Sequence, residues 1–257
     1  MSTASDPSEH QGAELPLTMS AAMSTITRYH EYLWSKVQPA LGARVMEIGV
    51  GFGQYTRRML AEGRCVLGCD LDDGHLRELR ASSPSALLQT QRLDLEEPEP
   101  ARAAAAAFAP DTVVLLNVLE HVRGHERALA FLQQVSAPGG RIVLIVPALQ
   151  ALINGLDREA GHHRSYSRAS LGQALEAGGW EVKSARYINL PGVAGWAVAG
   201  WLCGASRSGT DLNAPSTNWL LRFYNRFFVG LSRLIEPLAA HFAGLSVLAF
   251  ARKRGAA

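Results

Sequence analysis

Cysteine is scarce in this sequence. The 257 residues include three cysteines, Cys65, Cys69 and Cys203. No two of them form a C-x-x-C pair, the spacing typical of structural zinc sites and of dithiol redox motifs. A disulfide framework would need more cysteines in a shorter chain. We therefore expect no structural metal and a reducing compartment, the cytoplasm.

An excess of charge of either sign is also missing. Lys and Arg together number 25, Asp and Glu together number 23, and the formal net charge is +2. Proteins that bind nucleic acids concentrate Lys and Arg on one surface and carry a clear positive excess. The balanced charge argues against a nucleic-acid partner and favours a small molecule.

Long hydrophobic runs are absent as well. The longest, Leu190–Cys203, is interrupted by Pro191 and by three glycines, and it is shorter than the roughly 20 residues that span a bilayer. Residues 1–17 have neither an apolar core nor a basic leader, so we expect a disordered leader and not a signal peptide or an anchor. We predict no transmembrane helix and no stable membrane insertion.

What the sequence does contain is a regular alternation of apolar strand-like segments and amphipathic helices. Such an alternation predicts a parallel sheet with right-handed crossovers and helices on both faces. The expected strands are 44–48, 65–69, 87–93, 112–117, 141–146, 180–187 and 245–251, and the expected helices are 20–40, 54–62, 73–81, 102–108, 127–135 and 168–177. We predict one α/β domain, residues 18–257, with a doubly wound, Rossmann-like, seven-stranded and mostly parallel sheet and an N-terminal helix.

Three alternating glycines follow the first expected strand. Gly49, Gly51 and Gly53 come just after an acid, Glu47. Glycines in such a turn let the backbone adopt positive φ angles and approach a ligand closely. Dinucleotide folds that bind a pyrophosphate use the spacing G-x-G-x-x-G, whereas the spacing here is G-x-G-x-G. Because a carboxylate before the loop would repel a phosphate, the pattern favours a cationic ligand.

Two further acids stand at the ends of expected strands. Asp70 lies 21 positions after Gly49, where nucleotide-binding folds place an acid that accepts hydrogen bonds from ribose hydroxyls. Asp94 follows the third strand in the same way. The neighbouring Asp72 and Asp73 suit the start of a helix, whose dipole favours carboxylates. An NAD(P)-dependent reductase is an alternative, because the glycines and Asp70 partly match its fingerprint.

The fourth strand runs into an Asn-Val-Leu-Glu-His segment, residues 117–121. Taken in order, the glycine loop, Asp70, Asp94, this segment and the Pro-Gly-Gly turn at 138–140 resemble the motifs of class I S-adenosylmethionine (SAM)-dependent methyltransferases. The resemblance covers residues 45–147. It implies a Rossmann-like fold and SAM as the methyl donor.

The same resemblance implies roles for individual residues. Glu47 and the glycines would hold the amino-acid end of SAM, Asp70 the ribose and Asp94 the adenine, while His121 would lie near the transferring methyl group. The expected cofactor-binding residues are Glu47, Gly49, Gly51, Gly53, Asp70, Leu71, Asp94, Leu95, Asn117 and Val118.

A second distinctive block, residues 156–168, resembles the D-x-x-x-G-H-x-R-x-Y segment of a bacterial branch of this family. Ser165 departs from the doubled arginine of that branch. In open α/β sheets, loops after the carboxyl ends of strands lie where ligands bind. His162 could remove a proton from an acceptor, Arg164 could hold an anionic group, and Tyr166 could orient either one. The expected catalytic residues are His121, His162 and Tyr166, and the expected substrate-binding residues are Asp157, His163, Arg164 and Trp196.

Two other interpretations of this block stay open. Asp157 and Arg164 could pair and brace the loop without touching a substrate. A metal ion held by Asp157, His162 and His163 is disfavoured, because adjacent histidines in an extended loop point in opposite directions. We therefore predict no metal site.

More than fifty residues separate the last two expected strands, and they are rich in tryptophan. We expect a helical insertion, 191–241, that forms a lid over the cofactor face and places Trp196 beside the acceptor. A wide apolar surface suits a hydrophobic specialised metabolite or its precursor. The same residues are compatible with ordinary core, with a homodimer contact or, across 219–235, with a helix lying in the plane of a membrane.

These observations predict a SAM-dependent methyltransferase that acts on an oxygen, nitrogen or carbon atom of a small hydrophobic acceptor. The reductase is the first alternative. The second is a SAM-binding regulatory subunit without catalytic activity.

Overall fold

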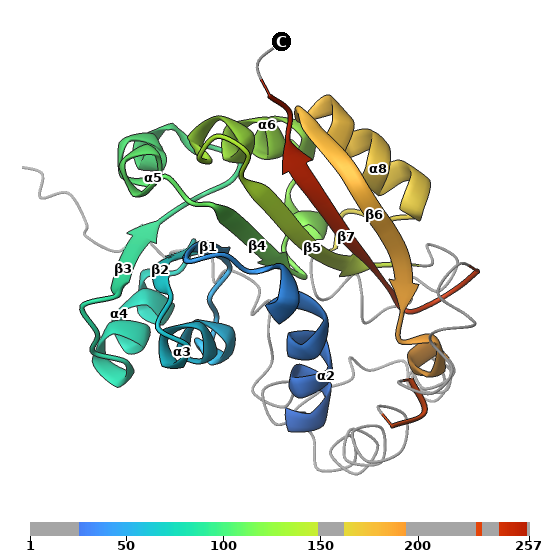
Figure 1. The fold of residues 1–257 in the computed structure, drawn as a ribbon, viewed down its shortest axis with the longest axis horizontal. Helices are drawn as coiled ribbons and strands as arrows, with labels where there is room; N and C mark the ends of the chain where they lie inside the picture. Colours follow the sequence, from blue (N-terminus) through green and yellow to red (C-terminus); the bar gives the residue numbers. More distant parts are fainter. Residues whose placement is uncertain (1–25, 149–161, 194–229, 233–241, 256–257) are drawn as a thin grey trace, which may run out of the picture.

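The structure, a computed structural model, describes residues 26–148, 162–193, 230–232 and 242–255. The expected leader, 1–17, and most of the expected insertion, 191–241, lie outside the described residues. Seven strands form one sheet in the order β3-β2-β1-β4-β5-β7-β6 (Figure 1). Their bounds are β1 Arg44–Ile48, β2 Cys65–Asp70, β3 Leu88–Arg92, β4 Thr112–Leu116, β5 Arg141–Pro147, β6 Trp180–Ile188 and β7 Ser246–Lys253. The predicted seven-stranded α/β fold is confirmed.

The sheet is mostly parallel, as predicted. Strands β1 to β5 pair in parallel, whereas β7 runs antiparallel to both β5 and β6. From β1 the chain winds outward to β2 and β3, then returns to β4 on the other side of β1. The boundary between β1 and β4 is therefore the point where the winding reverses. Open α/β sheets bind their ligands at the carboxyl ends of the strands beside such a point.

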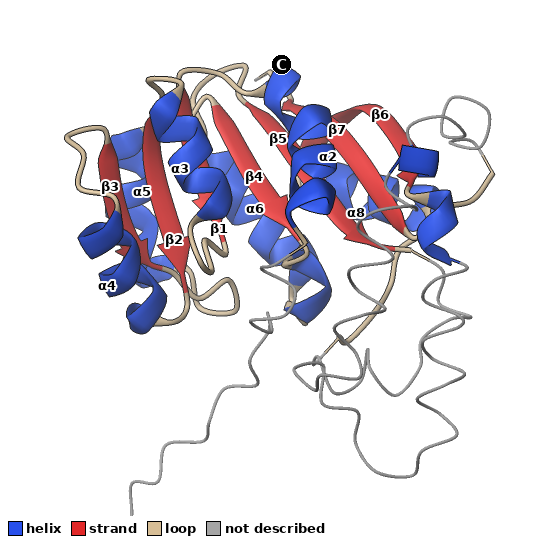
Figure 2. Cartoon of the chain, turned by 90° about the horizontal axis from the view of Figure 1, so that it is seen from below, coloured by secondary structure: helices blue, strands red, loops and turns tan. Residues whose placement is uncertain are grey.

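Helices cover both faces of the sheet. Helices α2, α3 and α4 lie on one face and α5, α6 and α8 on the other (Figure 2). Their bounds are α2 Thr27–Val37, α3 Gln54–Ala61, α4 Asp73–Ser82, α5 Arg102–Phe108, α6 His125–Val135 and α8 Arg168–Ala177, with 3-10 turns η1 Gln38–Ala40, η2 Glu99–Ala101 and η3 Leu119–His121. No helix within these described ranges is both long and apolar enough to cross a membrane.

Alternation along the central strands fills two cores. Val45 of β1 and Val114 of β4 pack beneath α2 and α3, while Met46 and Leu115 pack against the helices of the opposite face. All four side chains are buried. Because successive strand residues point to opposite faces, a strand in a sheet covered on both sides carries apolar side chains on both of its faces.

Local signals set the helix ends, with small departures from expectation. Asp72 caps α4 and accepts a hydrogen bond from the Gly74 amide at 2.6 Å, as its place before the helix predicts. The N-terminal helix ends as an α-helix at Val37 and continues as a 3-10 turn, because Pro39 has no N–H to donate. Strand β7 extends two residues beyond its predicted end, because Arg252 pairs with Arg141 of β5 and Lys253 pairs with Trp180 of β6.

Candidate functional site

The glycine loop after β1 has the backbone that its spacing predicts. Gly49, Gly51 and Gly53 have φ angles of 77°, 48° and 71°, in the left-handed region that residues with a Cβ rarely adopt. At Gly49 an added Cβ would lie 2.6 Å from a methyl carbon of Val118, which follows β4. The loop therefore lies directly against the end of β4, at the point where the sheet winding reverses.

Asp70, the last residue of β2, braces this loop. One carboxylate oxygen accepts a hydrogen bond from the Gly51 amide and the other from the Asp72 amide, both at 3.0 Å. The His75 ring lies 3.4 Å from the carboxylate. The Asp70 side chain is 12 % exposed, and each carboxylate oxygen has a second acceptor position. Asp70 can thus support the loop and still accept hydrogen bonds from a ligand.

Glu47, in β1 just before the loop, is buried. Its side chain accepts a short hydrogen bond from the Thr56 hydroxyl at the start of α3. Burial raises the pKa of Glu47 to about 8, the Thr56 hydrogen bond opposes that rise, and the negative charge of Asp70 adds to it. A buried carboxylate of this kind gains a proton or a cationic partner when it can.

The end of β3 supplies the next part of the edge. Asp94 is half-buried and accepts a hydrogen bond from the Glu96 amide at 2.8 Å, while the Leu95 side chain is buried. Glu96, which belongs to none of the motifs, accepts hydrogen bonds from the backbone amides of Arg123 and Gly124. It ties this turn to the segment after β4. An exposed acid in a loop carries no sequence signal for such a long-range contact.

The turn after β4 places Glu120 and His121 beside His162 of the segment before α8. Asn117 has a φ angle of 55°, a left-handed conformation that asparagine tolerates better than most residues, and the chain then enters η3 with Glu120 and His121. The His121 and His162 rings lie edge to face, with centroids 4.8 Å apart. Glu120 is completely buried, and neither carboxylate oxygen has a hydrogen-bond partner within the described part of the chain. Burial raises the pKa of Glu120 to about 7, while the residue's own backbone amide and, to a smaller extent, the nearby His162 oppose that rise.

The segment before α8 is anchored to α6 and to the residues just before that helix. Tyr166 is buried, and its hydroxyl lies 2.7 Å from Nδ1 of His125 in α6. Arg164 contacts the same nitrogen and donates to the Arg123 carbonyl. Burial, together with the Arg164 charge, lowers the pKa of His125 below its usual range. These contacts brace the segment; the predicted roles of Tyr166 and Arg164 toward an acceptor stay predictions.

A buried polar group from three distant segments completes this edge. The Tyr29 hydroxyl of α2 forms hydrogen bonds with Asn189 after β6 and with Ser246 at the start of β7, and burial raises the pKa of Tyr29 to about 12. Asn189 is buried with a φ angle of 59°, and its backbone N–H donates to the Tyr32 hydroxyl at 3.1 Å. No sequence signal predicts this group, because its members are separated by more than fifty residues and each resembles ordinary core or loop.

The other predicted site residues divide into two sets. Leu71 and Val118 are half-buried at the edge, and His163 is exposed beside His162. Asp157 and Trp196 lie outside the described residues, so their predicted substrate contacts stay predictions. A separate hollow of about 360 Å³ is lined by residues such as Arg141, the first residue of β5. It lies at the amino end of that strand, away from the carboxyl ends, and is not part of this site.

Known proteins resemble this chain in sequence and fold. A family model described as a methyltransferase domain matches residues 21–185, more than half of the chain. The chain is 30% identical over 122 residues to the S-adenosyl-L-methionine-dependent Diels-Alderase iccD of Talaromyces variabilis, a match that covers 47% of this chain and 42% of that protein. It is 27% identical over 188 residues to a probable S-adenosylmethionine-dependent methyltransferase of Mycolicibacterium smegmatis, covering 69% of this chain and 70% of that one. The match thus spans less than half the length of the first relative.

A solved structure supports the fold. The crystal structure of an S-adenosylmethionine-dependent methyltransferase from Mesorhizobium loti superimposes with a TM-score of 0.54 at 19% sequence identity, over 86% of this chain and 97% of that one. At this level of identity, the similarity concerns the fold.

Proposed function

The chain belongs to the class I family of SAM-dependent methyltransferases, and from that premise we propose that it transfers the methyl group of SAM to a small hydrophobic acceptor. SAM is the cofactor of this family. Methyl transfer leaves the donor sulfur as a neutral thioether, so the protein's main tasks are to bind and align the two substrates. Alignment of this kind can lower a barrier by about 7 to 11 kcal/mol.

The observation that carries the proposal is the backbone conformation and the charge of the loop at the carboxyl end of β1, beside β4. Three glycines with left-handed φ angles bring the main chain of the loop against the end of β4, and the buried Glu47 lies beside them with a raised pKa. A cation satisfies this carboxylate, whereas a phosphate would be repelled by it. We propose that Glu47 and the loop hold the amino-acid end of SAM, Asp70 the ribose, and Asp94 with Leu95 the adenine. A nicotinamide-dependent reductase has no support from this edge or from the family.

The acceptor side is proposed to be the region around η3, α2 and the segment before α8. His121 and His162 face one another there, and either can remove a proton from an acceptor hydroxyl or amine. The name of the Talaromyces relative, a Diels-Alderase, supports a specialised metabolite as the acceptor class. We place the protein in the cytoplasm, without a nucleic-acid partner, and propose residues 191–241 as the lid.

Release of S-adenosylhomocysteine tests the activity. The full-length protein is incubated with SAM and fractions of a metabolite extract, and the product is followed by mass spectrometry. We expect fraction-dependent release, together with an acceptor whose mass increases by one methyl group. Tight SAM binding with no release in any fraction would favour the regulatory alternative. An isomerised product of unchanged mass would favour a cyclase activity.

The affinity for SAM is expected to depend on pH through Glu47. In the free protein this carboxyl is largely protonated below pH 8, and it must lose its proton to pair with the ligand's ammonium. We expect the Kd to fall at least about tenfold between pH 6 and 7.5, below the range of about 7.7 to 8.0 where an α-amino group itself loses its proton. Calorimetry measures the Kd across this interval.

Glu47→Gln is the matched control for this titration. The variant is neutral at every pH, so its Kd is expected to stay near the weak wild-type value at pH 6 and to show little pH dependence. A wild-type Kd that is flat across the interval, or a variant with the same slope as the wild type, would contradict the assignment of Glu47 to the ammonium.

His162→Ala is expected to slow methyl transfer more than it weakens SAM binding. A base at this position contributes about 10²- to 10⁴-fold, while the groups proposed to hold SAM lie on other elements. We expect turnover to fall at least about 100-fold, the SAM Kd to change less than about twofold, and added imidazole to restore part of the rate. Equal losses in turnover and in SAM affinity would assign His162 to the support of the site.

A further inference from the structure

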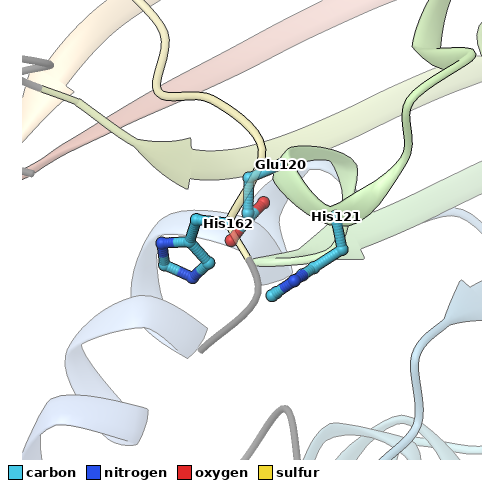
Figure 3. Close-up of side chains that lie close together, drawn as sticks. All are labelled: Glu120, His121 and His162. Carbon is cyan, nitrogen blue, oxygen red and sulfur yellow. The ribbon is translucent and has the colours of Figure 1, made fainter. Parts of the chain in front are cut away.

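The three polar side chains at the end of β4 form a cluster of metal-ligating groups. Glu120 and His121 come from η3, and His162 comes from the segment before α8 (Figure 3). One ligand atom from each residue lies within 4.8 Å of the other two. In the close-up the Glu120 carboxylate lies next to both imidazole rings. The cluster combines two imidazole nitrogen donors with one carboxylate oxygen donor.

Glu120 gives independent evidence that something binds there. The side chain is 0% exposed, and both carboxylate oxygens lack a hydrogen-bond partner among the described residues. An unpaired buried carboxylate is strongly unfavourable, and proteins that keep one pair it with a charge or a metal ion. Among the described residues, the two imidazoles offer ligand atoms close to it, and Tyr29 and Tyr166 are near enough to interact with its charge. A cation shared with the imidazoles would compensate the charge of the carboxylate.

We propose that Glu120, His121 and His162 bind a divalent first-row transition-metal ion of the zinc type. Two histidines and one glutamate are a ligand set that binds such ions with one position left open for water or substrate. Bond lengths of about 2.1 Å require ligand atoms about 3.4 Å apart. Rotation of the half-buried imidazoles can close the remaining ångström or so. The backbone already holds the three residues in place: the His163 amide donates to the Glu120 carbonyl at 3.0 Å.

This trio differs from the metal set considered from the sequence. The proposed trio keeps His162 and takes Glu120 and His121 from η3, a distant segment of the chain; it does not include His163, and Asp157 lies outside the described residues. The new set avoids the objection to adjacent histidines, because His121 and His162 approach the carboxylate from different segments.

The site also deepens the proposed function, on which the following step rests. With the ion bound, His121 and His162 serve as ligands and not as bases. An acceptor hydroxyl that enters the open position would then lose its proton to solvent at a lower pH, because the ion stabilises the oxyanion. That oxygen then forms a bond to the methyl carbon as the bond from carbon to sulfur breaks, and the sulfonium becomes a neutral thioether. A hydroxyl-bearing acceptor is the substrate class that this geometry favours.

Metal binding is tested directly on the full-length protein after chelation and dialysis. Titration with Zn²⁺ by calorimetry, and with Co²⁺ followed by its visible absorption, is expected to show one ion per chain. Glu120→Gln and His162→Ala should each weaken binding by at least about 100-fold, the upper end of what even indirect metal-site partners contribute. His163→Ala, which changes the exposed neighbour, should bind both ions as the wild type does.

Folding of the variants is checked by thermal unfolding and circular dichroism. Glu120→Gln removes an unpaired buried charge, so it is expected to unfold at or above the wild-type temperature. The proposal is overturned if the wild type binds neither ion, or if His163→Ala loses as much affinity as His162→Ala. It is also overturned if chelation leaves S-adenosylhomocysteine release unchanged. In that last case the methyltransferase proposal stands. If the metal ion binds but the protein neither binds SAM nor releases S-adenosylhomocysteine, the result contradicts the methyltransferase proposal and leaves the metal site standing.

Discussion

Asp70→Ala is expected to weaken SAM binding by about 3 kcal/mol, roughly a 150-fold rise in Kd. The carboxylate has two roles in this result. It accepts the Gly51 and Asp72 amides, and its remaining acceptor positions are proposed to take the ribose hydroxyls. Removing it would loosen the glycine loop and remove charged hydrogen bonds to the ligand at the same time. Calorimetry with SAM and with S-adenosylhomocysteine should show similar losses, because both carry the ribose.

Asp72→Ala is the matched control for this prediction. Asp72 is an acid two positions away whose side chain caps α4. Its loss should lower the free energy of unfolding by about 0.5 to 2 kcal/mol and leave the SAM Kd nearly unchanged. An Asp70→Ala protein that binds SAM within about threefold of the wild type would refute the ribose assignment. Equal losses in the two variants would show that the effect comes from α4 and not from the ligand.

Gly49→Ala is expected to destabilise the fold by about 2 to 5 kcal/mol and to abolish measurable SAM binding. The left-handed φ of 77° costs a residue with a Cβ about 1 to 2 kcal/mol. The new methyl group would also lie 2.6 Å from the Val118 side chain, and overpacking of this kind costs about 1 to 3 kcal/mol. Urea unfolding measures the change in stability.

Two comparison variants separate the causes. Gly172→Ala, in α8, places a methyl group where no atom lies within 4 Å, and it should stabilise the helix by about 0.5 to 1 kcal/mol. Val118→Ala combined with Gly49→Ala should recover the packing part of the loss and leave the φ part. A Gly49→Ala protein as stable as the wild type would mean that the loop does not require its left-handed turn.

Much of the fold could be predicted because its signals are local. The apolar run at Arg44–Ile48 and the helix at Arg102–Phe108 have the bounds that their patterns predict, since strand and helix periods are properties of short segments. The positive φ angles of the glycine loop follow from the residue type itself. Asp70 and Asp94 stand at strand ends, and the carboxyl ends of parallel strands meet at one edge. Residue patterns alone are therefore enough to predict the candidate cofactor edge.

The acceptor side could not be predicted in the same way. Tyr166 has the sequence context of a site residue, yet its hydroxyl contacts His125, forty-one positions away. Tyr29, Asn189 and Ser246 have no pattern in common, and only the packing of α2 across the ends of β6 and β7 brings them together. Contacts between residues so distant along the chain depend on the strand order of the sheet. Short-range periodicity carries no information about that order.

The class of fold, the glycine turn and the row of acids follow from the order of the residues, because each depends on a few neighbours and on backbone geometry. Three other features arise only when the chain packs. Glu120 is buried with no hydrogen-bond partner for its carboxylate among the described residues, and two histidines from different segments lie beside it. Strand β7 runs antiparallel to both of its neighbours. The physical reason is that burial removes water from a carboxylate. Whether that happens, and which groups replace the water, is set by the elements that pack around it and not by its own place in the chain.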